Sequence, residues 1–237
     1  MDLTRSAWTE IAAAAPATVL VPVGSCEQHG PHLPFDTDTR IAVAVASAVA
    51  RRLPDVHLAP PLSYGSSGEH QAFDGTLSIG TGALTAVLVE LGRSALPADG
   101  GGAFVSLVFV NGHGGNHDAV TAAVRRLADE GRAVSSWSPA IEGGDAHAGR
   151  SETALLLAID PSVVGDERPT GNVAPLRDIV AELRTGGVAA VSPNGVLGDA
   201  TGADAETGRQ ILDHLVDDLA AHVTRSGRAP SRRTAGG

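Results

Sequence analysis

Two short, almost wholly apolar segments, residues 18–24 and 104–110, are each followed at once by a loop rich in glycine and histidine. Runs of this length and composition are typical of strands buried on both faces, which occur almost only in parallel sheets. Segments with helical hydrophobic spacing follow both runs, so strands and helices alternate along the chain. The sequence therefore predicts a layered α/β domain with a mainly parallel sheet, because parallel strands need crossover connections on the faces of the sheet.

Other segments fit the same alternation. Further short strands are expected over residues 56–59 and 134–137. The expected helices cover residues 39–53, 84–96, 119–130, 152–159 and 205–223. The polar, glycine-rich stretch 64–70 contains little that could build a core, so we expect it to form a surface loop.

One domain accounts for this pattern. A chain of 237 residues can bury a sizeable core and shows no break in composition, so we expect a single domain over residues 1–225. Residues 226–237 contain Ser, Gly, Pro and Arg and nothing to bury. We expect this end of the chain to be a disordered tail.

The charged residues exclude several classes of function. Seventeen basic residues stand against 27 acidic ones, and the basic ones are scattered, so nucleic acid is not an expected partner. Every basic residue is arginine, and without lysine the chain cannot form a Walker-type phosphate loop, a pyridoxal Schiff base or a Ser-Lys dyad. The single Cys26, the lack of an export signal and the lack of an apolar run of about 20 residues favour the cytoplasm and no membrane partner.

Acidic residues and histidines gather where the two predicted strands end. Glu27, His29 and Asp38 follow the first strand, and His113 follows the second. Because ligands of parallel sheets collect at the carboxyl ends of strands, these side chains are expected to meet. Glu27 and His29 would share one face of an extended segment, and Asp38 returns close enough to bridge two metal ions. Any one of them alone could instead cap a helix or make a surface hydrogen bond.

Three motifs resemble those of a known family. They are residues 21–34 (VPVGSCEQHGPHLP) followed by Asp38, residues 111–116 (NGHGGN) and residues 147–153 (HAGRSET). In order and spacing they resemble the motifs of the creatininase family. The resemblance implies a three-layer α/β/α sandwich, a centre of two divalent metal ions, and hydrolysis of amides other than the peptide bonds of folded proteins.

The resemblance also implies roles for single residues. Glu27 would bind one ion and His29 the other, Asp38 would bridge them, and His113 would be a further ligand. This set of nitrogen and oxygen donors suits Zn, Fe(II) or Mn(II).

Two positions depart from creatininase itself. That enzyme has a glutamate ligand where this chain has Gly115, so we expect Glu152 to supply the missing carboxylate. It has a tyrosine where this chain has Gly114, so creatinine is a poor candidate substrate. Both glycines are expected in the substrate site, where the amides of residues 112–115 could bind an oxyanion or a substrate carboxylate.

Five further segments resemble one subgroup of the family. They are residues 64–71, 75–81, 143–145, 186–192 and 195–199. This subgroup matures the peptide-derived redox cofactor mycofactocin. The resemblance implies a peptidase that releases the C-terminal Val-Tyr unit of a modified precursor peptide, and the family as a whole suggests a closed homo-oligomer.

The expected mechanism is attack on the amide carbonyl by a water activated between two metal ions. His147 lies outside the expected ligand set and is the candidate acid that protonates the leaving amine. His70 is a candidate substrate contact together with its neighbour Glu69, although both could lie away from the site. Two alternatives stay open, a small-molecule amidohydrolase acting on a formamide or cyclic amide, and a non-catalytic metal-binding scaffold.

Overall fold

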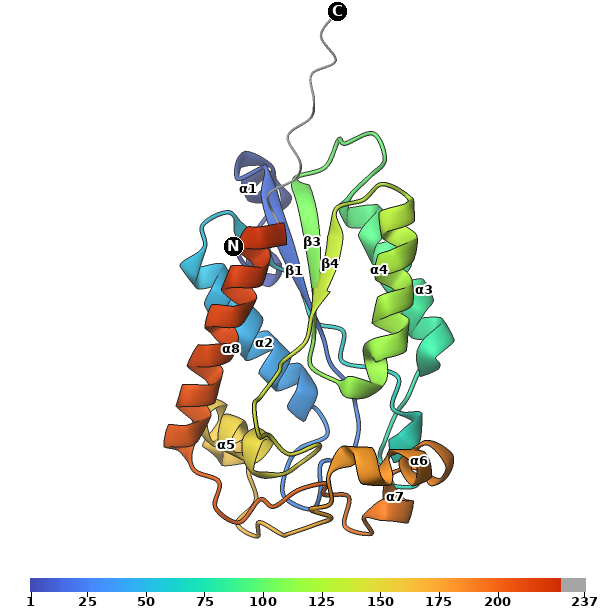
Figure 1. Ribbon diagram of the computed structural model, residues 1–237. Helices are drawn as coiled ribbons and strands as arrows, with labels where there is room; N and C mark the ends of the chain where they lie inside the picture. The colour runs from blue at the N-terminus through green and yellow to red at the C-terminus, as the bar shows by residue number, and fades with distance from the viewer. Residues whose placement is uncertain (227–237) are drawn as a thin grey trace, which may run out of the picture.

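The computed structural model describes residues 1–226, which form a parallel sheet between two layers of helices (Figure 1). The strands are β1 (Ala17–Val23), β2 (Val56–Leu58), β3 (Phe104–Asn111) and β4 (Val134–Trp137). Their order in the sheet is β2-β1-β3-β4, and each neighbouring pair is parallel. Every residue of β1 is buried, as two-sided covering of a parallel strand requires.

Alternate residues of the central strands pack against different helix layers. One layer consists of α3 (Gly80–Ala95) and α4 (His117–Asp129), and the other of α2 (Thr37–Arg52), α5 (Arg150–Ile159) and α8 (Ala205–Ser226). Val19 and Val21 belong to the apolar core shared with α3 and α4. Leu20 and Val108 belong to the core shared with α2, α5 and α8. The expected three-layer α/β/α sandwich is therefore confirmed (Figure 1).

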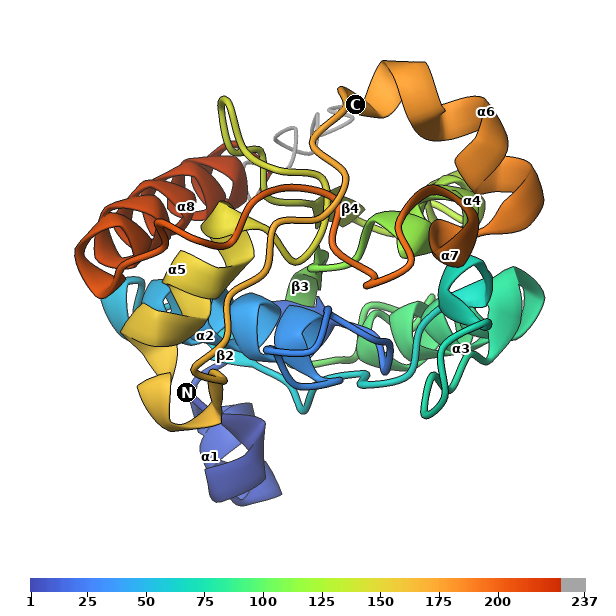
Figure 2. The ribbon, with the colours of Figure 1, turned by 90° about the horizontal axis from the view of Figure 1, so that it is seen from below.

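Shorter elements complete the described part of the chain. They are η1 (Leu3–Arg5), α1 (Trp8–Ala13), η2 (Gly68–His70), η3 (Gly114–Asn116), η4 (Pro161–Val163), α6 (Leu176–Gly186) and α7 (Val188–Val191). Helices α6 and α7 lie below the carboxyl ends of the strands in Figure 1, and Figure 2 looks onto this end of the molecule.

The predicted strands and helices are present, with ends that differ by a few residues. The last helix extends to Ser226, the first residue of the expected tail, and residues 227–237 lie outside the described part of the chain. The single domain over residues 1–225 stays a prediction. Within residues 1–226, no helix combines the length and apolar character needed to cross a membrane.

Candidate metal centre

The side chains of the candidate site come from loops at the carboxyl end of the sheet. In chain order they are Glu27 and His29 after β1, Asp38 in the first turn of α2, His113 after β3, and His147 and Glu152 around the start of α5. Glu27 and His29 have no exposed surface, and Asp38 and His113 are also buried. The structure thus brings together all residues predicted as ligands, although their roles stay predictions.

Asp38 faces histidines on two sides. Its Oδ1 lies 3.1 Å from Nε2 of His29, and its Oδ2 lies 3.2 Å from Nδ1 of His113. The hydroxyl of Ser25 donates a hydrogen bond of 2.7 Å to Oδ2 and fixes the carboxylate. This is the geometry that a carboxylate bridging two ions requires.

Glu27 forms a first ligand group with Asp38 and His113, whose ligand atoms lie within 4.8 Å of one another. Its Oε2 is 3.0 Å from Nε2 of His113. Within residues 1–226, both oxygens of this fully buried carboxylate accept no hydrogen bond. Burying a carboxylate that accepts no hydrogen bond is costly, so this group fits a cation.

His29, His147 and Glu152 form a second ligand group on the other side of Asp38. Glu152 Oε2 lies 3.9 Å from Nε2 of His29 and accepts a 2.6 Å hydrogen bond from the amide of Ala148. His147 was expected outside the ligand set, yet its imidazole is among the possible ligands here.

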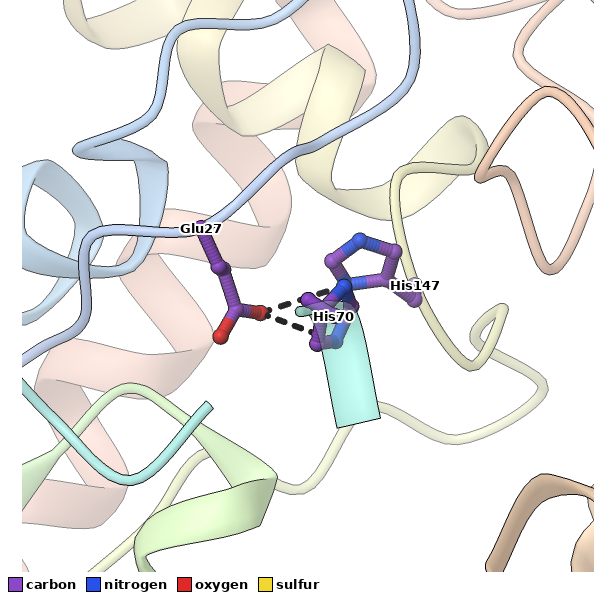
Figure 3. A group of neighbouring side chains, drawn as sticks. All are labelled: Glu27, His70 and His147. Carbon is purple, nitrogen blue, oxygen red and sulfur yellow. Dashed lines mark ion pairs between the residues drawn. The ribbon is translucent and has the colours of Figure 1, made fainter. Parts of the chain in front are cut away.

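Glu27, His70 and His147 form a third group, shown in Figure 3. Nε2 of His70 lies 3.3 Å from Oε1 of Glu27, and Nδ1 of His147 lies 3.8 Å from the same oxygen. The side-chain nitrogen of Gln28 lies 2.9 Å from Nδ1 of His70 and 3.1 Å from Nε2 of His147. Two imidazoles thus lie beside one carboxylate.

His70 reaches this place because the stretch 64–70 is largely buried, so the surface loop expected there was wrong. Ser66, Ser67 and His70 all lie in the interior. The amide of Ser66 donates to the side-chain oxygen of Asn116 at 2.8 Å, and Asn116 donates to the carbonyl of Gly24 at 2.9 Å. Polar side chains thus satisfy the polar backbone of the loop in the interior.

Protons and cations compete for the buried carboxylates. Burial lowers the pKa of His29, but Asp38, Glu152 and Glu27 together outweigh this effect and raise the pKa to about 10. Burial likewise opposes charge on His113, and Glu27 and Asp38 hold the pKa of this imidazole well above its usual value. A divalent cation can replace these protons, because it supplies the same positive charge to the same oxygens.

Burial also opposes charge on other groups of the site. Burial lowers the pKa of His70 to about 3 and keeps that of His147 well below its usual value. Burial raises the pKa of Glu152 to about 7. Neutral imidazoles and carboxylate oxygens are the donors that zinc, iron(II) and manganese(II) accept, so the residues present fit such ions.

A family model described as creatinine amidohydrolase matches residues 4–223. The chain belongs to the creatininase family.

A mycofactocin precursor peptide peptidase of Mycobacterium ulcerans (strain Agy99) is 54% identical over 218 residues, which cover 88% of this chain and 85% of the relative. A protein of the same name from Mycolicibacterium smegmatis (strain ATCC 700084 / mc(2)155) is 51% identical over 214 residues, covering 87% and 84%. A solved structure described as creatininase Mn has a TM-score of 0.78 at 26% identity and covers 96% of this chain and 99% of its own. The family and subgroup expected from the motifs are confirmed.

This creatininase-family chain has a cavity of about 820 Å³ beside the ligand groups. Glu27, His113 and His147 are part of its wall, and so are Gly114 and Gly115. The opposite wall is formed largely by α6, which has no buried residue of its own. A substrate in this cavity would contact both the ligand groups and α6.

One feature of the cavity was not expected from the sequence of this creatininase-family member. Leu176, Val180 and Leu183 line the cavity from α6, and their spacing of four and three residues is a helical signal that was available in the sequence. Glu69, a possible substrate contact in the sequence beside His70, lines the cavity as well, with Oε1 3.5 Å from Nε2 of His113.

Proposed function

We propose that the chain is a metal-dependent peptidase that trims a modified mycofactocin precursor peptide and releases its C-terminal Val-Tyr dipeptide. The observation that carries metal dependence is the buried Glu27 carboxylate, which accepts no hydrogen bond within residues 1–226 and lies beside Asp38 and His113. The choice of substrate is supported by identities of 54% and 51% to peptidases of that name.

In this proposal Asp38 would bind two ions. Glu27 and His113 would hold one of them, and His29 and Glu152 would hold the other, which the short distances within each group support. When bound, two ions of Zn, Fe(II) or Mn(II) supply a water of lowered pKa and polarise the amide carbonyl. A related creatininase structure described with Mn supports the class of metal.

His147 is proposed to move the proton from the attacking water to the leaving amine. Its Nε2 lies 2.9 Å from the carbonyl oxygen of Gln28, so Nε2 carries the hydrogen and donates it there. Its Nδ1 is then without a proton and faces Glu27. Nδ1 can take the proton released when the water attacks and return it to the nitrogen of the broken amide bond.

The cavity suits the end of a peptide. The apolar stripe of α6 can contact the valine and tyrosine side chains, while Arg184 and the amides of Gly114 and Gly115 can receive the terminal carboxylate. Arg184 forms no ion pair within the described residues 1–226. His70, which lies beside Glu27, is proposed to contact the substrate.

The proposal is tested with purified, metal-loaded protein and the modified precursor peptide, followed by mass spectrometry of the products. We expect release of a Val-Tyr fragment, loss of the reaction with a chelator and its return with added divalent metal. A peptide amidated at its C-terminus should react much more slowly, because it lacks the carboxylate that the cavity is proposed to receive.

Other outcomes would assign another function. Fast hydrolysis of a formamide or cyclic amide without peptide cleavage would indicate a small-molecule amidohydrolase, and two bound ions without any turnover would indicate a scaffold. We also propose that the protein is cytoplasmic and forms a closed homo-oligomer. The resemblance to the family supports both expectations. Light scattering of the purified protein tests the oligomer.

A further inference from the structure

Glu69 lies at the border between the ligand groups and the cavity. It belongs to η2 and its side chain is 30% exposed, while the carboxylate of Glu27 is fully buried. Within residues 1–226, the carboxylate of Glu69 forms no ion pair with an arginine, and its near charged partner is His113. The described side chains thus offer this carboxylate an imidazole and no guanidinium.

Gly115 makes room for this carboxylate. A Cβ atom at position 115 would overlap Oε1 of Glu69, Nε2 of His113 and the carbonyl oxygen of Ser66. A residue larger than glycine would therefore push Glu69 or His113 away. Gly115 thus leaves space for a carboxylate that enters from η2.

Four oxygens surround one nitrogen of His113. Its Nε2 lies 3.0 Å from Oε2 of Glu27 and 3.5 Å from Oε1 of Glu69. It also lies 3.1 Å from the carbonyl oxygen of Ser66 and 3.4 Å from the hydroxyl oxygen of Ser67. A single N–H cannot donate well to all of them. Donor atoms that share one ion at bond lengths of about 2.0–2.2 Å lie roughly 3–3.5 Å apart, which is the spacing between this nitrogen and both carboxylates.

We propose that Glu69 is a further ligand of the ion held by Glu27, Asp38 and His113, and that Gly115 is required because it admits this ligand. The inference rests on the proposed metal-dependent function and adds a ligand to it. Glu69 lines the cavity together with Glu27 and His113 and is the most exposed of the three, so it is the ligand most open to an entering substrate.

The test is a titration of metal-free protein with Zn²⁺ against a chelating indicator. Glu69→Gln keeps the shape of the side chain and removes its charge, so we expect one ion to bind about 10- to 100-fold more weakly while the other binds as before. Glu182→Gln is the matched control, because Glu182 is exposed on α6 and does not line the cavity. It should bind both ions like the wild type. Glu69→Asp should fall between the two.

Thermal unfolding separates a ligand from a residue that only supports the fold. Removing a ligand should leave the melting temperature of metal-free protein unchanged and reduce the increase caused by Zn²⁺. The proposal is wrong if Glu69→Gln binds both ions with wild-type affinity, or if it lowers the melting temperature equally with and without Zn²⁺. Neither readout uses a peptide, so failure of peptide cleavage would count against the proposed substrate alone.

Discussion

Asp38 occupies a position that its acidic neighbour cannot take over. Its two oxygens face His29 and His113, whereas Asp36 lies half exposed and pairs with Arg40 at 2.7 Å. The two aspartates therefore have the same charge and different surroundings, which makes them a natural pair for comparison.

Asp38→Ala should lose more metal than any other single substitution, because it removes a ligand from both ions. Elemental analysis of protein purified with excess metal measures the stoichiometry. Asp36→Ala is the control and should retain wild-type metal content. A stoichiometry near two ions in Asp38→Ala would contradict the bridging role.

His147 and Glu152 lie in one ligand group but are predicted to act differently. His147→Ala should keep both ions and lose about 10² to 10⁴ in turnover, the usual contribution of a positioned proton donor. Glu152→Ala should lower the metal content. His214→Ala, on the exposed face of α8, is the control for changing a histidine. Metal loss in His147→Ala would make His147 a ligand instead.

Metal binding should release protons near neutral pH. The nearby carboxylates of Asp38, Glu152 and Glu27 raise the pKa of His29 to about 10, and that of His113 is also raised, so both imidazoles carry a proton that a metal ion displaces. Affinity for metal should therefore rise with pH through the neutral range. Calorimetric titrations in two buffers of different ionisation enthalpy measure the release, and equal heats in both would contradict it.

Helix α6 covers the cavity without belonging to either apolar core. None of its residues is buried, and Leu176, Val180 and Leu183 face the cavity instead. Leu155 of α5, by contrast, is 1% exposed and lies in the core. A helix that buries so little of itself contributes little to stability and is free to contribute to binding.

Leu183→Ser should raise the KM for the peptide about tenfold, since burying a leucine against a ligand contributes roughly 1.5–3 kcal/mol at most. Its melting temperature should stay close to that of the wild type. Leu155→Ala is the contrasting variant and should lose about 2–5 kcal/mol of stability. A clear loss of stability in Leu183→Ser with unchanged KM would place α6 in the core rather than at the substrate.

The elements that hydrophobic pattern alone predicted are those of the two cores. β1 and β3 were predictable because two-sided burial leaves almost no polar residue in them. The stretch 64–70 was not, because its burial depends on Asn116, which is distant in sequence and satisfies the backbone of Ser66. A polar stretch is predicted to be a surface loop when the distant side chain that hydrogen-bonds to its backbone is not known.

The site was predictable to a similar extent. The ligand candidates Glu27, His29, Asp38 and His113 stand next to strand ends, and the motifs mark them. The contact of His70 with Glu27 was not predictable from spacing, because it is made across loops that only the folded sheet brings together.

The candidate site joins distant parts of the molecule. The loop after β1, the short helix η2 and the residues around the start of α5 meet there through side chains rather than through the sheet. Removing the ions should loosen these loops while both apolar cores stay intact.

This arrangement makes trypsin a probe of the metal site. The enzyme can cut this chain only after arginine, and the exposed Arg150 stands between His147 and Glu152. We expect rapid cleavage after Arg150 in protein treated with a chelator and slow cleavage in metal-loaded protein, measured by mass spectrometry over time. Cleavage after Arg177, which lies outside the ligand groups, should proceed at the same rate in both, and equal rates at Arg150 would contradict the idea. The amount of the fragment cut after Arg150 would then measure the fraction of the protein that holds metal, before any substrate is known.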